Sequence, residues 1–268
     1  MKVAAIQMVS TPEVQTNLDT ARELLRQAAA AGAELAVLPE YFCLLGLNDT
    51  DKLAIAEQPG HGPMQDFLSR CALDFKLHLV GGTIPIVAPE PGKVYNRTLV
   101  YSPQGQCVVQ YDKMHLFCFD NGSERYDEAR VLTAGKEPVA FYMTARDGCL
   151  WRIGLSICYD LRFPELYRAL KADVLLVPSA FTHTTGQAHW ELLLRARAIE
   201  NLAFVVAAAQ GGLHDNGRRT WGQSLIVSPW GDVVAELTQG SGCVLADIDK
   251  ASLSQRRMQL PALDHRLL

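Results

Sequence analysis

Long hydrophobic runs are absent from this 268-residue chain. A membrane-spanning helix needs roughly 18 or more consecutive apolar residues, so we expect no membrane span. The N-terminal segment 2–8 also lacks the longer apolar stretch and the small-residue cleavage site of a secretory leader. We therefore interpret this segment as a first buried strand and expect a cytoplasmic protein.

A large excess of charge is absent as well. The 25 basic and 29 acidic residues give a formal net charge of −4. No basic cluster alternates with aromatic side chains, as a nucleic-acid groove requires. We expect neither a nucleic-acid nor a membrane partner, which leaves small molecules as the ligands to consider.

Paired cysteines and metal-binding motifs are also absent. The seven cysteines are an odd number and include no Cys-x-x-Cys pair, a usage typical of a reduced cytoplasmic protein. The histidine spacing matches neither His-Glu-x-x-His nor a zinc site. The glycine pairs at 81–82 and 211–212 fit neither a P-loop nor a dinucleotide fingerprint. We expect no metal and no cofactor.

Apolar residues make up 49% of the chain, which is enough for a sizeable core. Strand-like and helix-like patterns alternate without a linker or a repeat, which predicts a single domain over residues 1–268. Hairpins mixed with strand–helix units predict an α/β fold with two mixed sheets flanked by helices. The expected strands include 2–8, 35–38, 77–84 and 150–157, and the expected helices include 17–31, 63–76, 164–170 and 189–201. Residues 114–135 show neither period and are expected to form a long functional loop.

Three reactive side chains each follow an apolar, strand-like run. They are Glu40, Lys113 and Cys158. Strand ends are where α/β proteins usually gather their chemistry. A carboxylate, an amine and a thiol brought together there can act as a base, a charge stabiliser and a nucleophile.

Cys158 differs from the other cysteines in its local sequence. Free cysteine is usually an inert core residue, and that interpretation suits most of the seven. At Cys158, however, a strand gives way to the polar turn 159–162 before a helix. Backbone N–H groups there can lower the thiol pKa and can bind an oxyanion. On local sequence alone, an inert and a catalytic cysteine are both open.

The base that would serve this thiol is also open at this stage. Glu40 can accept the proton if burial raises its pKa, although a solvated loop carboxylate has the same sequence signature. His115 or His189 could instead form a Cys-His dyad. Most lysines are solvated surface charges, so Lys113 alone would carry little weight.

Taken together, the three segments resemble the carbon–nitrogen hydrolase (nitrilase) superfamily. They are Leu-Pro-Glu at 38–40, Tyr-Asp-Lys-Met-His-Leu-Phe at 111–117 and Cys-Tyr-Asp-Leu-Arg-Phe-Pro-Glu at 158–165. Further matching stretches are Pro-Ser-Ala-Phe at 178–181, Ala-His-Trp-Glu at 188–191, Arg-Ala-Arg-Ala-Ile-Glu at 195–200 and Ser-Pro-Trp-Gly at 228–231. The resemblance runs from residue 1 to about residue 266 and is closest to the deaminated glutathione amidase and omega-amidase group.

The resemblance implies an α-β-β-α sandwich and a Glu-Lys-Cys triad. Glu40 would be the base, Lys113 the transition-state stabiliser and Cys158 the nucleophile. The family also has a second glutamate after the long loop, for which Glu128 is the better match and Glu124 the weaker one. Family members commonly dimerise through helices, so we expect a homodimer or a higher homo-oligomer.

The implied reaction is hydrolysis of a non-peptide amide through a cysteine thioester, without a cofactor. Lys113 and the Tyr159 backbone N–H would face the oxyanion. The expected substrate is the ω-amide of a small α-keto acid, such as deaminated glutathione. The alternatives are an omega-amidase acting on α-ketoglutaramate, another small-amide hydrolase, or a Cys-His acyltransferase.

Three positions bear on which amide is used. Arg162 could bind a substrate carboxylate, although an ion pair with Glu165 is equally open. Cys118 stands where relatives usually carry an acidic residue, and Gln187 stands where they commonly have proline. Both departures concern the substrate pocket rather than the reaction class.

Overall fold

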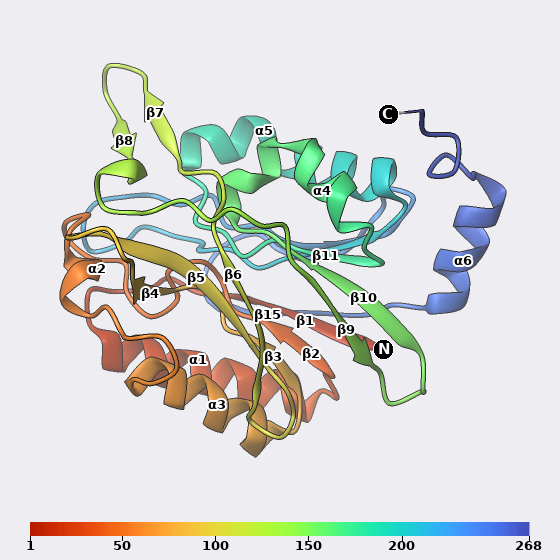
Figure 1. Ribbon diagram of the computed structural model, residues 1–268, viewed down its shortest axis with the longest axis horizontal. Helices are drawn as coiled ribbons and strands as arrows, with labels where there is room; N and C mark the ends of the chain where they lie inside the picture. Colours follow the sequence, from red (N-terminus) through yellow and green to blue (C-terminus); the bar gives the residue numbers. More distant parts are fainter. Residues whose placement is uncertain (268) are drawn as a thin grey trace.

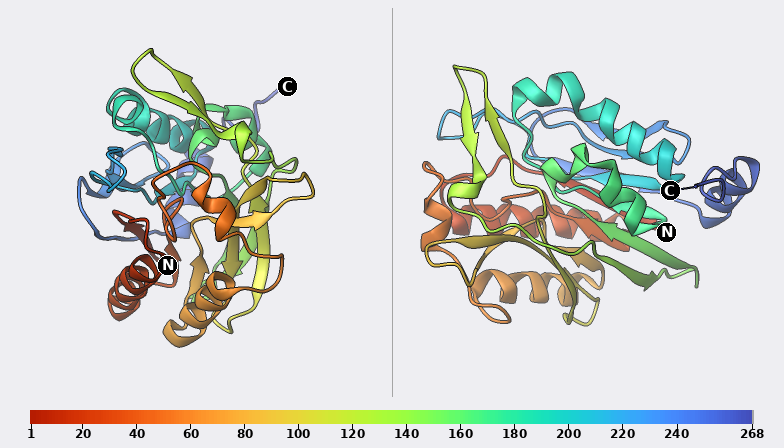
Figure 2. Two further views of the ribbon diagram at one scale, coloured as in Figure 1. Left: turned by 90° about the vertical axis from the view of Figure 1, so that its left-hand side faces the viewer. Right: turned by 45° about the horizontal axis from the view of Figure 1, so that its top comes forward.

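We describe the protein from a computed structural model, which describes residues 1–267. Two β-sheets lie face to face between two layers of helices (Figures 1 and 2). The predicted α-β-β-α sandwich is therefore confirmed. No helix within residues 1–267 combines the length and the apolar character that crossing a membrane would require.

The first sheet has seven strands. In spatial order it contains β15 (Gly242–Asp247), β1 (Lys2–Gln7), β2 (Leu35–Val37), β3 (His78–Val80), β5 (Val94–Tyr101) and β4 (Ile84–Val87), and β6 (Cys107–Asp112) also pairs with β5. Strands β1, β2 and β3 are parallel, whereas the β15, β4, β5 and β6 pairings are antiparallel. The sheet is mixed, as the sequence predicts.

The second sheet has six strands. In order it contains β14 (Val233–Leu237), β13 (Ser224–Val227), β12 (Phe204–Ala207), β11 (Val174–Leu176), β10 (Leu150–Leu155) and β9 (Ala140–Thr144). Its central strands β10, β11 and β12 are parallel. Both sheets thus direct the carboxyl ends of parallel strands toward one edge, where loops can carry reactive side chains.

Helices cover the outer face of each sheet (Figure 2). The crossovers of the first sheet are α1 (Val14–Ala30) and α3 (Pro63–Phe75), and those of the second are α4 (Pro164–Leu170) and α5 (His183–Asn201). Shorter or peripheral helices are α2 (Asp51–Ala54) and α6 (Lys250–Gln259). Parallel strands need such crossovers, because a tight hairpin cannot return the chain in the same direction.

Strand β1 explains why the N-terminal apolar run is continuous. Val3 and Ala5 face the core between the two sheets, whereas Ala4 and Ile6 face the core beneath α1 and α3. Side chains alternate between the faces of a strand, so a strand covered on both sides must be apolar at every position. The same argument applies to the buried residues of β2.

Three predicted elements differ from the observed ones. The expected strand 77–84 is two strands, β3 and β4, separated by a turn at Gly82 with φ +51°. The expected loop 114–135 contains a hairpin of β7 (Cys118–Asp120) and β8 (Arg125–Asp127), followed by a 3-10 helix at Glu128–Arg130. Helix α5 begins six residues before the predicted start at His189, because the Thr182 hydroxyl caps its first turn.

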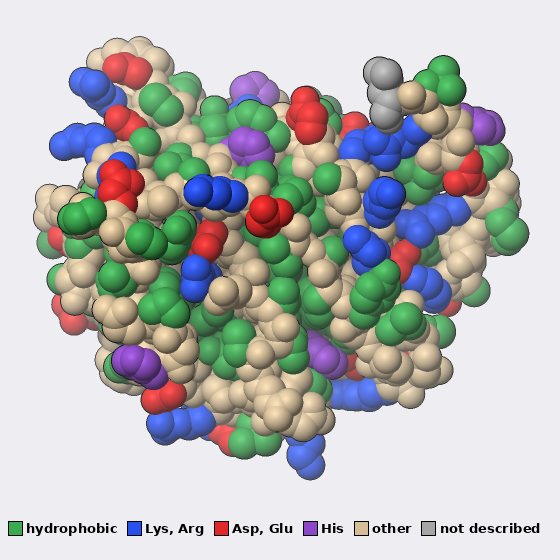
Figure 3. Space-filling model, viewed as in Figure 1, with side chains coloured by type: hydrophobic (Ala, Val, Ile, Leu, Met, Phe, Trp, Pro, Cys, Tyr) green, Lys and Arg blue, Asp and Glu red, His purple; other side chains and the backbone are tan. Residues whose placement is uncertain are grey.

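Helix α6 lies at the end of the molecule away from the β7–β8 hairpin (Figure 1). Lys and Arg side chains gather around it on the face shown in Figure 3. Lys250 and Arg257 of α6 share the carboxylate of Asp173 next to β11. These ion pairs fasten the C-terminal helix to the second sheet.

Gly82 allows two backbone segments to approach closely beside Glu40. A Cβ atom at this position would lie 2.1 Å from the Pro39 carbonyl oxygen, far inside van der Waals contact. The neighbouring Thr83 hydroxyl accepts a hydrogen bond from the Tyr41 N–H at 2.8 Å. The turn between β3 and β4 therefore sets the position of the segment that carries Glu40.

Replacing Gly82 with alanine should displace this segment. We expect Gly82→Ala to lower the free energy of unfolding by roughly 2–4 kcal/mol, because left-handed backbone strain and overpacking add together. Gly92→Ala is the matched control: Gly92 also has positive φ, yet nothing lies within 4 Å of the place that a Cβ would take. It should cost about 1 kcal/mol. If urea denaturation gave equal losses of unfolding free energy for the two variants, the close approach to Pro39 would not contribute to stability.

Candidate active site

Glu40, Lys113 and Cys158 meet at one edge of the sandwich. Glu40 lies three residues after β2, Lys113 directly follows β6, and Cys158 lies three residues after β10. The Lys113 Nζ donates a hydrogen bond to Glu40 Oε1 at 2.9 Å. Cys158 is close enough to both that the charges of Glu40 and Lys113 act on the pKa of its thiol. The structure thus brings together the three side chains that the sequence singles out, while their catalytic roles stay predictions.

The Glu40 carboxylate is buried, with only 1% of the side chain exposed. Oε1 accepts a second hydrogen bond from Asn96 Nδ2 at 2.8 Å, and Oε2 accepts one from the Ala180 N–H at 3.0 Å. Burial raises the pKa of Glu40 above its ordinary value, although the Lys113 charge opposes this effect. A carboxylate with a raised pKa and a thiol beside it is suited to accept a proton at neutral pH.

Lys113 is bound to two carboxylates at once. Its Nζ donates to Glu128 Oε1 at 3.0 Å and to Oε2 at 2.7 Å, in addition to Glu40. Burial would lower the pKa of Lys113, but the charges of Glu128 and Glu40 raise it well above the ordinary value. Lys113 is therefore a fixed cation beside Cys158 rather than a proton donor.

Glu128 is held from three sides. Besides Lys113, the Tyr41 hydroxyl donates to Oε1 at 2.8 Å and the Phe117 N–H donates to Oε2 at 2.7 Å. Burial would raise its pKa, but Lys113 and the hydrogen bond from the Phe117 N–H lower it, so Glu128 is ionised. Glu124, the weaker match for this position, lies in the hairpin turn and accepts a hydrogen bond from the Thr184 hydroxyl instead.

Cys158 begins a 3-10 helix, Cys158–Arg162, with a left-handed backbone at φ +50°. This conformation is unfavourable for a residue with a Cβ, and such strain is common at functional sites. Burial and the Glu40 charge raise the thiol pKa well above its ordinary value. The sequence indicates that backbone N–H groups can lower this pKa; in the structure the Ala180 N–H does lower it, but desolvation outweighs that effect. The resting group is a thiol, and its reaction needs an adjacent base.

Asp160 ties the nucleophile turn to the end of β6. Its buried carboxylate accepts hydrogen bonds from the Ile157 N–H at 2.8 Å, the Tyr111 hydroxyl at 2.7 Å and the His115 N–H at 3.0 Å. Ile157 precedes Cys158, while Tyr111 and His115 flank Lys113. One carboxylate thus fixes the separation between the thiol and the ammonium.

The two candidate histidines have other partners. His115 Nδ1 lies 2.7 Å from Asp160 Oδ1, and its ring stacks on Phe163. His189 Nδ1 lies 3.4 Å from the Arg162 guanidinium. No hydrogen bond between a histidine ring and Cys158 occurs within the described residues. The geometry favours Glu40 over histidine as the base.

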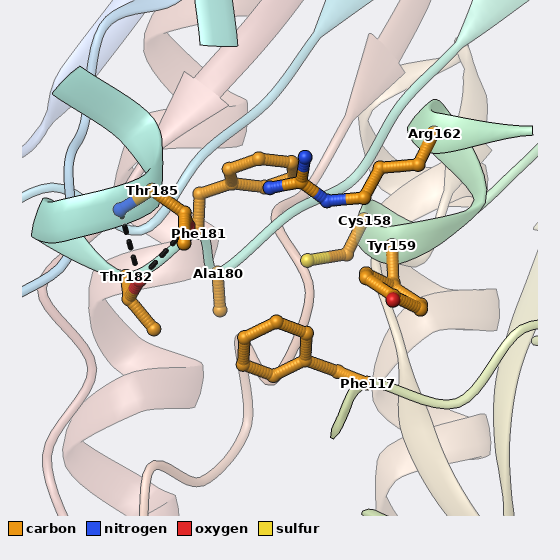
Figure 4. Close-up of a pocket in the computed structure, with 8 residues that line it drawn as sticks. All are labelled: Phe117, Cys158, Tyr159, Arg162, Ala180, Phe181, Thr182 and Thr185. Carbon is orange, nitrogen blue, oxygen red and sulfur yellow. Dashed lines mark hydrogen bonds between the residues drawn. The ribbon is translucent and has the colours of Figure 1, made fainter. Parts of the chain in front are cut away.

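A pocket opens at the Cys158 thiol. Figure 4 shows the sulfur pointing into it, with Arg162 and Phe117 on different sides. It is lined by Phe117, Cys158, Tyr159, Arg162, Ala180, Phe181, Thr182 and Thr185. The backbone N–H of Tyr159 belongs to the first turn of the 3-10 helix, where N–H groups lack intrahelical partners. It is available to an oxyanion.

Arg162 has no carboxylate partner within residues 1–267. Its guanidinium lies 5.8 Å from the Tyr159 ring centroid and 5.6 Å from that of Phe181. The ion pair with Glu165, which the sequence leaves open, does not form in the structure. A guanidinium held by aromatic faces at a pocket wall is suited to bind an anion.

The two departures from the family pattern lie outside this pocket. Cys118 is exposed and follows Phe117 at the start of β7. Gln187 is exposed on α5, two residues after Thr185. Each is close in sequence to a residue that lines the pocket, but neither lines the pocket itself.

Sequence reasoning missed Asn96, Asp160 and the Ala180 N–H as parts of this site. Asn96 gave only a weak signal, because it stands with Arg97 and Thr98 in a polar stretch of β5 that the sequence does not show to be buried. Asp160 stands in the cysteine segment, but nothing in the sequence indicates which groups its carboxylate contacts. The Ala180 N–H gave no signal, because every residue except proline carries the same donor.

Metal binding would require a cluster of suitable donors. Within residues 1–267 no group of three or more His, Cys, Asp or Glu side chains is arranged to hold a metal ion.

Comparison with known proteins identifies the family. The sequence model of the carbon–nitrogen hydrolase family matches residues 2–258. A deaminated glutathione amidase from Synechocystis sp. is 42% identical over 98% of this chain and 97% of its own length. The omega-amidase NIT2 of Xenopus tropicalis is 35% identical over 97% of this chain and 92% of its own length.

Solved structures agree. The C. elegans NitFhit protein superimposes with a TM-score of 0.88 at 35% identity; the match covers 99% of this chain and 65% of that longer one. A second structure is a glutamate-to-glutamine variant of the amidase from Nesterenkonia sp. AN1, described with acrylamide added at its active-site cysteine. It superimposes with a TM-score of 0.77 at 26% identity, and the match covers 97% of this chain and 98% of that one. The chain therefore belongs to the carbon–nitrogen hydrolase family and is an enzyme of the amidase type.

Proposed function

We propose that the protein is a thiol amidase in which Glu40, Lys113 and Cys158 form the catalytic triad. One observation carries this proposal: a single buried ammonium binds both Glu40 and Glu128 beside the thiol. The cysteine adduct described for the Nesterenkonia amidase supports a nucleophilic cysteine in this family.

Acylation begins with proton transfer from the Cys158 thiol to Glu40. The sulfur attacks the amide carbonyl carbon, and the carbonyl oxygen becomes an oxyanion that Lys113 and the Tyr159 N–H stabilise. Protonated Glu40 then donates its proton to the amide nitrogen as the C–N bond breaks. The amine leaves and a thioester on Cys158 remains.

Deacylation uses the same groups in turn. A water molecule gives a proton to Glu40 and attacks the thioester carbonyl. The second oxyanion forms at the position of the first. Its collapse breaks the C–S bond, releases the carboxylic acid and returns the proton from Glu40 to the sulfur. Glu128 keeps Lys113 in place and charged through both halves of the reaction.

The substrate we propose is the ω-amide of a small α-keto acid, as in deaminated glutathione. Such an acyl group carries a carboxylate, and the Arg162 guanidinium at the pocket wall can bind it. The curated relatives named deaminated glutathione amidase support this substrate. The alternative substrate is α-ketoglutaramate, which the similarity to an omega-amidase supports. Deaminated glutathione and α-ketoglutaramate have the same acyl group.

We also propose that the protein is a cytoplasmic homodimer. All seven cysteines are free, which suits a reducing compartment.

Helix α5 exposes two large apolar side chains, Leu192 and Ile199, on the outside of the sandwich. A second copy covering this helix would bury them.

Removing the thiol tests the nucleophile. We expect Cys158→Ala to fold but to lose essentially all release of amine from α-ketoglutaramate, because no other group can form the acyl intermediate. Cys107→Ala, at an exposed cysteine, should keep normal turnover. Hydrolysis by the Cys158→Ala enzyme with an unchanged pH profile would rule out the thioester route.

The pH profile tests Glu40 as the base. Its raised pKa should put the acid limb of kcat/KM above pH 4.5, the ordinary value for glutamate. Asn96 donates a hydrogen bond to the ionised carboxylate, so Asn96→Leu should raise the pKa further and move the limb to higher pH. Asn48→Leu, at an exposed position, is the control. A limb that stays in place or moves to lower pH would argue against Glu40.

Substrate charge tests Arg162. A charge-assisted hydrogen bond contributes about 1.5–3 kcal/mol, so Arg162→Gln should lower kcat/KM for α-ketoglutaramate by roughly tenfold to a hundredfold. A neutral aliphatic amide should be a poor substrate for both enzymes and should change little. Arg26→Gln on α1, which is exposed and pairs with Glu23, serves as the control. Equal losses on charged and neutral amides would show that Arg162 only supports the structure.

A further inference from the structure

A second cavity adjoins the catalytic cluster on the side of Glu128. It shares Phe117 with the pocket at Cys158. Its lining residues are Tyr41, Asp49, Lys52, Phe117, Tyr126, Asp127, Glu128, Val131 and Arg218. Two cations in this set, Lys52 and Arg218, have no part in the reaction described above.

Lys52, on the short helix α2, is an ammonium without a counter-ion. Its Nζ lies 4.9 Å from the centroid of the Tyr41 ring. Within residues 1–267 it makes no ion pair and no hydrogen bond. Burial lowers the pKa of Lys52, although the charges of Glu128 and Asp49 oppose this. Lys52 is partly buried and makes no ion pair, an arrangement that costs free energy unless a ligand completes it.

Arg218 supplies a second cation to the same cavity. Its guanidinium lies 4.7 Å from the Tyr126 ring centroid, and the ion pair that it makes with the exposed Asp49 is a long one of 3.6 Å. A guanidinium held against an aromatic ring keeps its donor edge free for a carboxylate.

The acidic groups of the cavity are already engaged. Both oxygens of Glu128 bind Lys113 and receive further hydrogen bonds from the Tyr41 hydroxyl and the Phe117 N–H. The Asp127 carboxylate caps the 3-10 helix by accepting the Ala129 N–H at 3.2 Å. Asp49 faces Arg218 and is largely exposed. Within the described residues, none of these carboxylates forms an ion pair with the ammonium on α2.

The acyl group and the leaving amine lie on opposite sides of the scissile bond, and the second cavity is on the side of the amine. The acyl group joins the sulfur in the pocket that holds Arg162, and the amide nitrogen must face Glu40 to receive its proton. Lys113 connects Glu40 to Glu128, and Glu128 lines the second cavity. The two cavities share Phe117 as a wall, so a leaving group that extends past Phe117 on this side would reach the cations of the second cavity.

We infer that this cavity is a leaving-group subsite in which Lys52 and Arg218 bind the carboxylate of an amino-acid or peptide amine. The inference rests on the proposed amidase function and deepens it. An α-keto acid amide whose amine is a peptide carries one anion at each end, and the enzyme offers cations at both ends. A primary amide releases ammonia and leaves the second cavity unused.

Three amides of α-ketoglutarate test the subsite with one acyl group throughout. They carry cysteinylglycine, cysteinylglycine with a C-terminal carboxamide, and ammonia as leaving groups. For the unaltered enzyme, kcat/KM should be about tenfold or more higher for the carboxylate than for the carboxamide. Lys52→Met and Arg218→Gln should each reduce this ratio severalfold and should bring it close to one when combined.

Matched variants and the third substrate separate binding from folding. Lys93→Met, in an ion pair with Glu90, and Arg125→Gln, on the exposed face of β8, should leave the ratio unchanged. A ratio near one for the unaltered enzyme overturns the subsite, and so does an equal loss on all three amides in the Lys52 and Arg218 variants. Failure to hydrolyse any of the three amides would instead overturn the proposed function on which the subsite rests.

Discussion

The attraction between one buried ammonium and two buried carboxylates is the constraint on which the site depends. Lys113, Glu40 and Glu128 come from three segments of the chain, and each has lost most of its water. Burial of charge is unfavourable unless the geometry and the remaining hydrogen bonds are complete. Here they are complete, because Asn96, Tyr41 and the backbone N–H groups of Phe117 and Ala180 occupy the other lone pairs.

This charge arrangement also explains why the nucleophile rests as a thiol. An ionised Cys158 would add a third anion to a cluster that already has two carboxylates for one cation, and burial removes the help of water. Transfer of the proton to Glu40 moves a negative charge within the cluster without adding one. The cluster thus makes the proton transfer between neighbours easier than the loss of a proton to solvent.

Local patterns predict the layers of the fold well and its connections less well. The continuous apolar run at β1 and the amphipathic pattern at α1 report burial on two faces or on one face, which is a local property. The split between β3 and β4 depends on the contact of Gly82 with Pro39, and the β7–β8 hairpin depends on its own short pairing. Neither contact leaves a periodic signal. In the site, Glu40, Lys113 and Cys158 could be found because reactive side chains follow apolar runs, whereas Asp160 acts through contacts that only the folded chain creates.

The segment between β6 and β9 contributes to two parts of the site at once. It supplies Phe117 to the wall of the substrate pocket, and it supplies Glu128 to the charge cluster. The peptide N–H of Phe117 is itself bound to Glu128. An exchange of this segment that is meant to change specificity, in evolution or by engineering, must therefore also keep the buried Glu128 carboxylate in position. New specificities in this architecture are easier to reach by single side-chain changes around a fixed backbone than by grafting a foreign loop.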